Sequence, residues 1–426
     1  MRGKNLISLI LVSILFSSQV IKASSFKDQL EEQDGVKILH LKGSCYEMGY
    51  QHGSLLREEC RENLRAFLNF AKYFGYSYDD FLKLWRKAEE YIPQEYREEM
   101  QGLADGAGVS FDDVAVGNII VMLIHCSGFA AWGSATIDGK LYQLRSLDFP
   151  MFIKDPITGK SIQENSIIII REPSNGFASL DPSFAGFIGS LGGINENCIA
   201  VEVLSSWSDD EQYNGIPMVF RQRMVLDHAA SIEDAIDILT SNRTCGWNFI
   251  VSDGKIPIGY AVEVTANYSY VGTWNNTIES TYPFWVIDHV VRRTNIFIDS
   301  TTASTQRKRY DPRLFPILSL FININPLSWG MVPSSIPWIH YRALSEGIES
   351  KLGMLDLNSS MTVARELYQG KIDRFFSLLV ELGFYSTLHQ WVACPETGDI
   401  LISFATRDKD AYENPVHHFN LFSLLK

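Results

Sequence analysis

The strongest constraint on the fold is a change of hydrophobic periodicity near Cys126. Residues 46–112 carry apolar side chains at the spacing of amphipathic helices, until several glycines interrupt the pattern. Beyond Cys126 the apolar runs become short and β-branched, most clearly at 167–170, which is typical of strands. Helical and strand patterns then alternate once more. Because such elements must bury their apolar faces against one another, the sequence favours an α+β fold with two sheets packed face to face and helices outside.

The same criteria predict the remaining elements along the chain. Further strands are expected at 140–144, 198–204, 247–252, 258–265 and 390–405. Further helices are expected at 219–239, 341–351 and 362–382. No internal repeat or low-complexity linker divides these elements, so the sequence predicts one composite domain.

The first residues have the pattern of a secretory leader. A short basic start is followed by an apolar run at 6–16 and by a small-residue cleavage site before Ser24. The alternative is a membrane anchor, but this run is too short to cross about 30 Å of hydrocarbon. We therefore expect a signal peptide at 1–23, no stable membrane span, and a mature chain that is secreted or lysosomal. Four Asn-x-Ser/Thr sequons predict glycosylation at Asn242, Asn267, Asn275 and Asn358.

The mature chain is acidic. Removal of Arg2, Lys4 and Lys22 with the leader takes the formal net charge from −13 to −16. A surface of this sign argues against nucleic acid and anionic membranes as partners. The six cysteines are too few for a disulfide scaffold, although Cys45 and Cys60 flank a predicted helix and could pair.

Cys126 lies where the helical half gives way to strands, and Arg145-Ser146-Leu147-Asp148 follows it at the end of the next predicted strand. The turn dipeptide Asp138-Gly139 between them indicates a hairpin. A hairpin would bring Arg145 and Asp148 back beside the start of the first strand. A single cysteine is usually a small buried hydrophobe or half of a disulfide, so Cys126 needs further support as a nucleophile.

That support comes from ordered sequence blocks over nearly all of the mature chain. They are the segments 43–53, 92–106, 126–127, 145–149, 192–196, 245–253, 293–295 and 307–312. Together these blocks resemble the penicillin acyltransferase-like family of cysteine N-terminal-nucleophile (Ntn) hydrolases, which is related to choloylglycine hydrolases and acid ceramidases. The last two blocks are similar to acid ceramidase-like proteins of social amoebae.

The resemblance implies a four-layer αββα Ntn-hydrolase sandwich of two antiparallel sheets between helical layers. It also implies self-cleavage between His125 and Cys126, giving a helical chain of residues 24–125 and a catalytic chain of residues 126–426 that stay associated. No cofactor is implied. No metal site is predicted either, because the adjacent His417 and His418 cannot chelate from one strand face.

The implied chemistry uses the new chain terminus. The freed α-amino group of Cys126 would act as base for its own thiol, because the two groups titrate near pH 8 and 8.5. Arg145 would favour the thiolate, and Asp148 would hold the ammonium group by a charge-assisted hydrogen bond. Asn248 and Asn195 are the candidate donors to the tetrahedral oxyanion. Glu263 and Arg342 could line the site or form buried pairs.

Two positions depart from the family pattern. His125 precedes the scissile bond where relatives often carry a small or acidic residue, and Ile296 stands where relatives frequently carry histidine. The sequence therefore leaves the rate of self-cleavage open, and a role borrowed from the second position does not transfer.

Three functions stay in competition. The leading hypothesis is an amidohydrolase or acyltransferase acting through an acyl-thioester on an N-acyl amine, a lipid amide or a small amide. A papain-like cysteine protease pairing Cys126 with His389 is the second, although Cys126 opens a strand rather than a helix. The third is a secreted binding protein that keeps the fold without the chemistry, against which the presence of Cys126, Arg145, Asp148 and Asn248 together argues.

Overall fold

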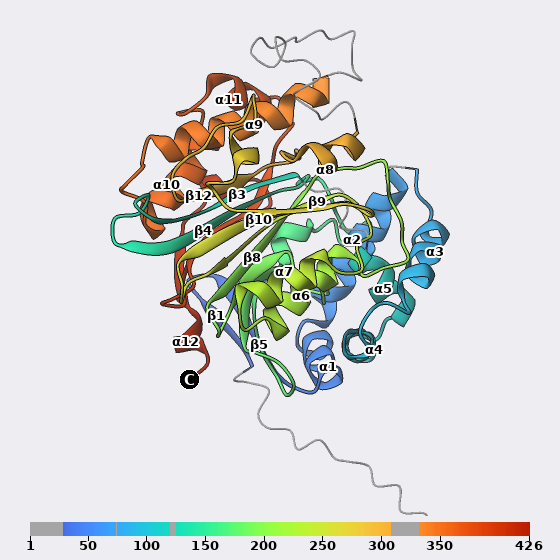
Figure 1. The fold of residues 1–426 in the computed structure, drawn as a ribbon. Helices are drawn as coiled ribbons and strands as arrows, with labels where there is room; N and C mark the ends of the chain where they lie inside the picture. The colour runs from blue at the N-terminus through green and yellow to red at the C-terminus, as the bar shows by residue number, and fades with distance from the viewer. Residues whose placement is uncertain (1–28, 74, 120–124, 308–331) are drawn as a thin grey trace, which may run out of the picture.

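Two β-sheets lie face to face between layers of helices in the computed structural model of the chain (Figure 1). It describes residues 29–73, 75–119, 125–307 and 332–426. The predicted leader and most of the 307–312 block lie outside these residues. Among the described residues, no helix has the length and apolar character needed to cross a bilayer.

The first sheet has nine strands in the order β1-β2-β5-β6-β7-β8-β9-β10-β11, and the second has six in the order β12-β3-β4-β13-β14-β15. The strands of the first sheet are β1 (Leu30–Gln33), β2 (Val36–Gly43), β5 (Ser166–Pro173), β6 (Ser179–Phe184), β7 (Gly192–Asn195), β8 (Ile199–Ser205), β9 (Trp247–Asp253), β10 (Ile258–Val264) and β11 (Ser269–Gly272). Those of the second are β12 (Val290–Arg293), β3 (His125–Gly133), β4 (Gly139–Asp148), β13 (Thr387–Cys394), β14 (Asp399–Phe404) and β15 (His417–Asn420).

Helices cover the outer face of each sheet (Figure 1). On the nine-stranded sheet lie α1 (Cys45–Leu55), α2 (Arg57–Tyr73), α3 (Tyr78–Ala88), α4 (Gln94–Ala107), α5 (Phe111–Ile119), α6 (Met218–His228) and α7 (Ile232–Thr240). On the six-stranded sheet lie α9 (Val332–Glu349), α10 (Leu357–Tyr368) and α11 (Arg374–Glu381). The shorter α8 (Ser300–Thr305) and α12 (Leu421–Leu424) follow β12 and β15.

The apolar run at 167–170 shows why four layers form. Ile168 and Ile170 point between the sheets, where they cluster with Trp391 and Ile400 of the other sheet. Ile167 and Ile169 belong to the cluster that includes the helices of the first layer. A strand buried on both faces has no polar alternation, which explains the continuous β-branched pattern. The predicted two-sheet architecture between helical layers is confirmed.

The amino-terminal part differs from the purely helical prediction. Strands β1 and β2 precede the first helix, and β2 pairs with β5 in parallel, whereas the other adjacent strands of both sheets pair antiparallel. Residues 24–125 therefore supply two strands to the sheet built by the later part of the chain. The two parts thus share one sheet, and their description as one composite domain stays a prediction.

The blocks at 43–53 and 92–106 meet as helices α1 and α4. A Cβ atom on Gly49 would lie 1.9 Å from the carbonyl oxygen of Glu99, and one on Gly102 would lie 2.1 Å from that of Tyr46. The two backbones thus approach more closely than any larger residue allows. Glycine is therefore required at these positions for helix packing and not for catalysis.

Candidate active site

Cys126 is the second residue of β3, and the antiparallel partner β4 brings the predicted residues beside it. Gly128 pairs with Arg145, and His125 pairs with Asp148. The side chain of Cys126 is fully buried. The hairpin predicted from Asp138-Gly139 therefore places Arg145 and Asp148 next to the start of β3.

Arg145 is the cation nearest to the thiol. Its Nη2 donates to the Cys126 Sγ at 3.3 Å and to the Val203 carbonyl oxygen at 3.2 Å, and its Nη1 donates to the His389 Nε2 at 2.8 Å. No carboxylate of the described residues forms an ion pair with it. Since all of these acceptors are neutral or the sulfur itself, the guanidinium charge stays available to a thiolate.

Burial raises the pKa of the Cys126 thiol to about 12, and the positive charge of Arg145 offsets part of this rise. The Cys126 nitrogen is still part of a peptide bond in the intact chain, so the base implied by the Ntn resemblance is absent. In the intact chain the Cys126 thiol therefore has a cation beside it but no amine base.

The Asp148 carboxylate turns toward helix α10. It accepts hydrogen bonds from the Tyr368 hydroxyl at 2.7 Å and from the Thr387 hydroxyl at 3.1 Å. Burial raises its pKa well above the usual range, and these two donors lower it in part. The backbone of Asp148 also lowers the pKa of the Cys126 thiol through a hydrogen bond. Its predicted hold on the α-ammonium group stays a prediction.

Asn248 supports a neighbouring loop. Its Nδ2 donates to the carbonyl oxygens of Thr294 at 2.9 Å and Ile296 at 2.8 Å. Both hydrogens of the amide are therefore occupied, which differs from the predicted role as an oxyanion donor. Glu263 fastens the same loop by accepting from the Ile298 and Asp299 backbone, so it belongs to a buried structural pair with Arg293.

The residue that this loop presents is Asn295, which the sequence reasoning missed. The backbone N–H of Cys126 donates to its Oδ1 at 3.4 Å, and its Nδ2 donates to the Ser205 carbonyl oxygen at 2.8 Å. Asn295 is thus the side-chain amide next to the atom that would become the new amino terminus. The sequence block at 293–295 was the available signal for this residue.

Asn195 lies in a tight connection between β7 and β8. Its Nδ2 donates to the carbonyl oxygens of Leu226 and Ala229, and its Oδ1 accepts from the backbone of Asn197 and Ile199. None of these contacts reaches Cys126. The side chain holds the turn to helix α6, as an ordinary turn asparagine does.

Glu202 is a second residue that the sequence reasoning missed. It is buried on β8, and neither carboxylate oxygen has a hydrogen-bond partner in the described part of the chain. A Cβ on Gly128 would lie 2.3 Å from both oxygens, so the carboxylate sits directly against β3. Burial raises its pKa well above the usual range, and Arg145 lowers it in part. Its signal was a single acid inside an otherwise apolar strand.

His389 bonds Arg145 rather than the Cys126 sulfur. A guanidinium can only donate, so Nε2 must accept and the imidazole is neutral. Burial and Arg145 lower the pKa of His389 well below its usual value. A papain-like thiolate–imidazolium pair is therefore absent from this geometry.

Comparisons with known proteins agree with the sequence blocks. Residues 151–312 match the family described as acyl-coenzyme A:6-aminopenicillanic acid acyl-transferase. Protein dcd1B of Dictyostelium discoideum is 29% identical over 265 residues, covering 55% of this chain and 51% of that protein. Acid ceramidase of Rattus norvegicus is 27% identical over 189 residues, covering 38% of this chain and 45% of that protein. The resemblance to the penicillin acyltransferase-like family is confirmed.

This chain spans about half the length of two of the curated relatives that it matches. The family match begins after Asp148 and includes Glu202, Asn248 and Asn295. Among solved structures, the Caenorhabditis elegans ortholog of N-acylethanolamine-hydrolyzing acid amidase aligns with a TM-score of 0.41 and 15% sequence identity. That alignment covers 64% of this chain and 93% of the other.

An open pocket adjoins the end of β4. Asp148 lies on its wall together with Trp207 and Phe384. The other apolar lining residues are Phe70, Phe149, Met151 and Phe152. The pocket beside Asp148 is therefore lined mainly by aromatic side chains and is suited to an apolar group.

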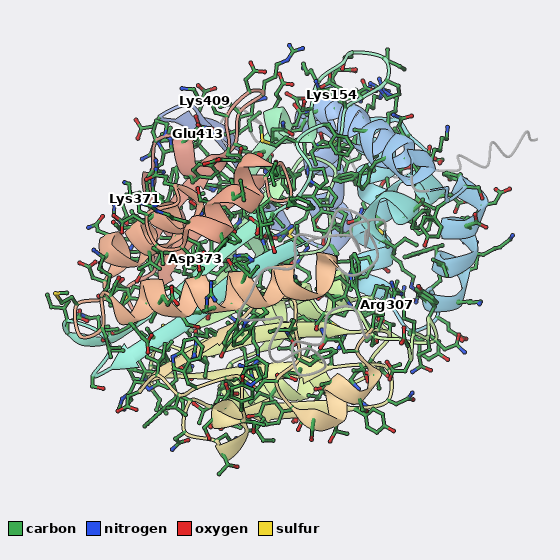
Figure 2. The ribbon with its side chains drawn as sticks, turned by 90° about the horizontal axis from the view of Figure 1, so that it is seen from above. Lys154, Arg307, Lys371, Asp373, Lys409 and Glu413 are labelled. Carbon is green, nitrogen blue, oxygen red and sulfur yellow. The ribbon has the colours of Figure 1, made fainter. Side chains whose placement is uncertain are left out.

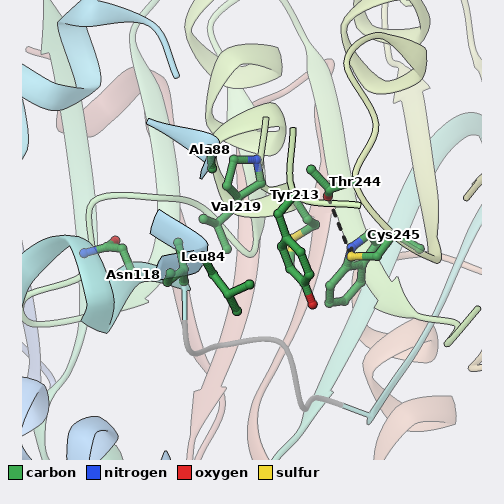
Figure 3. A pocket seen from close by; sticks show the side chains of 11 residues that line it. Leu84, Ala88, Asn118, Tyr213, Val219, Thr244 and Cys245 are labelled. Carbon is green, nitrogen blue, oxygen red and sulfur yellow. Dashed lines mark hydrogen bonds between the residues drawn. The ribbon is translucent and has the colours of Figure 1, made fainter. Parts of the chain in front are cut away.

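A second pocket lies on the outer side of the nine-stranded sheet, between helices α3, α5 and α6 (Figure 3). Cys245 lies on its wall, next to Thr244 and Tyr213. Burial raises the pKa of this thiol to about 11. The charge of the buried Arg221 lowers this pKa in part, so Cys245 also has a cation nearby. What sets Cys126 apart is the β3–β4 hairpin that brings Asp148 beside it and the Asn295 amide at its nitrogen.

The remaining predicted residues lie away from Cys126. Arg342 pairs with Asp373 at 2.6 Å where α11 begins beside α9 (Figure 2). The four sequon asparagines are exposed, which permits the predicted glycosylation. Cys45 and Cys60 are free thiols. Within the described residues, no group of three or more His, Cys, Asp or Glu side chains could hold a metal ion.

Proposed function

We propose that the chain is a self-processing Ntn cysteine amidohydrolase or acyltransferase of the secretory pathway. The observation that carries this proposal is the buried Cys126 thiol beside an Arg145 that forms no ion pair with any carboxylate of the described residues. The papain-like alternative lacks its imidazole partner, because His389 is committed to Arg145.

Self-cleavage would begin with attack of the Cys126 sulfur on the carbonyl carbon of His125. The peptide C–N bond breaks, the nitrogen takes up the proton that the thiol loses and becomes the α-amino group, and the acyl group passes to sulfur as a thioester. Water then hydrolyses the thioester. The two chains would stay associated, because β2 of the first pairs with β5 of the second.

Turnover would use the new amino group as base for the thiol. Arg145 stabilises the thiolate, and Asn295 holds the amino group through its side-chain amide. Glu202 lies near Arg145 and the Cys126 thiol and has no hydrogen-bond partner among the described residues, so we assign it proton transfer during turnover. The acyl group forms a thioester with Cys126, the amine leaves with a proton, and water or a second amine releases the acyl group.

The aromatic pocket supports an N-acyl amine or lipid amide as the substrate class. Apolar walls bind an acyl chain in proportion to the area that it buries, about 0.8 kcal/mol per methylene. We therefore expect kcat/KM to rise with acyl chain length until the pocket is filled. A screen of N-acyl amines of graded length at acidic and neutral pH measures this.

Processing is the decisive test. The purified mature protein should run on a denaturing gel as two pieces, and the larger should begin Cys-Ser-Gly. Cys126→Ala should abolish both processing and amide hydrolysis, whereas Cys245→Ala, a matched buried thiol, should preserve both. A single uncut chain that still hydrolyses amides would refute the mechanism. An uncut and inactive wild-type chain would favour the binding-protein alternative.

A further inference from the structure

We infer that His389 is a positioning residue that aims the Arg145 guanidinium at the Cys126 sulfur while leaving its charge free. The inference rests on the proposed function, because it assigns Arg145 to the thiolate. His389 does not touch the reacting atoms. It acts through one hydrogen bond to the residue that does.

The first observation behind this inference is the hydrogen-bond geometry of the Arg145 guanidinium. The Arg145 guanidinium has one Nη group on His389 and the other on Cys126 and Val203. A planar guanidinium held at one Nη can present the other in few directions. The His389 contact therefore fixes where the Nη2 hydrogen points.

The second observation is that the group accepting a hydrogen bond from Arg145 Nη1 is neutral. A carboxylate at this position would hold Arg145 equally well, but it would neutralise the cation that a thiolate needs. Imidazole Nε2 is a neutral acceptor, so it orients without neutralising. The Val203 carbonyl oxygen does the same on the other side. Both acceptors thus keep the electrostatic effect of Arg145 directed at the sulfur.

The third observation is that aromatic rings pack around His389 and hold its imidazole in place. Its ring stacks on Phe184 with centroids 6.1 Å apart and planes at 10°, and Phe404 meets it edge-on at 6.0 Å. The side chain is fully buried, and its Nδ1 has no hydrogen-bond partner among the described residues. The rings fix the imidazole plane. No acidic group in the described chain contacts His389, so nothing stabilises an imidazolium there.

Three substitutions separate orientation from charge. His389→Gln keeps a neutral acceptor, His389→Leu removes the acceptor, and His389→Glu supplies an acceptor that neutralises Arg145. The measurement is the rate of Cys126 alkylation by iodoacetamide against pH, together with kcat and KM on an N-acyl amine. Alkylation reports the thiolate fraction, which falls about tenfold for each unit by which the thiol pKa rises.

We expect the Gln variant to keep the wild-type alkylation profile within about twofold. The Leu variant should react about tenfold more slowly at neutral pH, and the Glu variant more slowly still. In both variants kcat should fall, whereas KM should not rise. His52→Gln is the matched control, because His52 is also buried and accepts one backbone N–H, from Gly186, away from the site.

Equal alkylation profiles in all three variants, with only thermal stability changed, would overturn the inference. A Glu variant as reactive as the Gln variant would also overturn it. Failure of the proposed function gives a different result: alkylation of wild-type Cys126 would then leave amide hydrolysis intact. The alkylation profiles would still report whether His389 controls the thiol through Arg145.

Discussion

The buried arginines of this molecule fall into two environments. Arg223, on α6, forms ion pairs with Glu99 at 3.0 Å and Asp227 at 2.9 Å. Arg145, equally buried, bonds only neutral acceptors and the Cys126 sulfur. An ion pair removed from water must be satisfied by its partners, and Arg223 meets this requirement. Arg145 does not, and neither do the buried Arg221 and Arg292 among the described residues. What distinguishes Arg145 from these two is its hydrogen bond to the Cys126 sulfur.

The same contrast holds for buried acids. Glu263 accepts from Arg293, two backbone N–H groups and a threonine hydroxyl, whereas Glu202 has no partner in the described chain. An unsatisfied buried group costs stability that better pairing would recover. The region around Cys126 thus combines an un-neutralised cation with an unpartnered acid, both of which the rest of the core must stabilise.

Removing the cation from the buried ion pairs of Arg223 should have the largest effect on stability. Arg223→Met would leave the Glu99 and Asp227 carboxylates buried without a cation, and such losses cost about 3–5 kcal/mol. We expect a strongly lowered unfolding midpoint in denaturant. A variant as stable as the wild-type chain would show that this ion-pair cluster does not hold α4 to α6.

Breaking the unpaired region should instead affect activity. Arg145→Met removes a cation that lowers the pKa of Glu202 but forms no ion pair with a carboxylate of the described residues, so the unfolding midpoint should change less than in Arg223→Met. Loss of a charge that stabilises the nucleophile should lower kcat by about 10²–10³-fold, the range seen for preorganised electrostatic groups. Steady-state kinetics and denaturant unfolding on both variants test the comparison. Equal stability losses in the two would contradict it.

Asn248 and Asn195 sharpen the comparison with uncharged residues. Each is buried and donates from Nδ2 to two backbone carbonyls, but only the Asn248 contacts support the loop that carries Asn295. Alanine at either position should cost about 1–3 kcal/mol of stability. Only Asn248→Ala should also lower kcat, by about tenfold, through misplacement of Asn295. A similar kcat loss in Asn195→Ala would remove the distinction.

Local sequence patterns predicted the elements that depend on local contacts. The alternation of helical and β-branched runs gave the two sheets, and one hairpin sufficed to bring Arg145 and Asp148 to Cys126. Asn295 escaped prediction because it meets Cys126 from 169 residues away in sequence. Glu202 escaped because periodicity cannot tell whether a lone acid within an apolar strand finds a partner. Tertiary contacts of this kind also explain why the Asn248 amide donates to two backbone carbonyls, whereas the sequence predicted a donor to the oxyanion.

Glu202→Gln tests whether the Glu202 carboxyl, which has no hydrogen-bond partner in the described residues, takes part in the reaction. Since burial raises the folded-state pKa of Glu202 above the unfolded value, the wild-type chain loses stability as pH rises above the unfolded pKa. The neutral amide lacks this penalty, so the variant should be more stable than the wild-type chain at neutral pH, by roughly 1–3 kcal/mol. Hydrolysis should nevertheless slow. Unchanged turnover would leave Glu202 without a role in the proposed reaction.

Asp410 is an intermediate case between the paired and unpaired acids, and we expect the smallest effect there. It is partly buried, it accepts from the Thr387 backbone N–H, and Thr387 in turn donates to Asp148. Burial raises the pKa of Asp410 from 3.8 to about 6. Between these values the folded chain holds a proton that the unfolded chain has lost, so stability falls as pH rises through this window.

Asp410→Asn removes this titration while keeping an acceptor for Thr387. We expect the wild-type chain to lose on the order of 1 kcal/mol relative to the variant between about pH 4 and pH 7, after allowance for solvent screening of a group at the rim. Thermal unfolding of both proteins across this range measures the change. A constant difference between them would mean that Asp410 ionises at its ordinary pH. A growing difference would mean that the rim of the site, like its centre, is more stable when its carboxyls are neutral, which suits an acidic compartment.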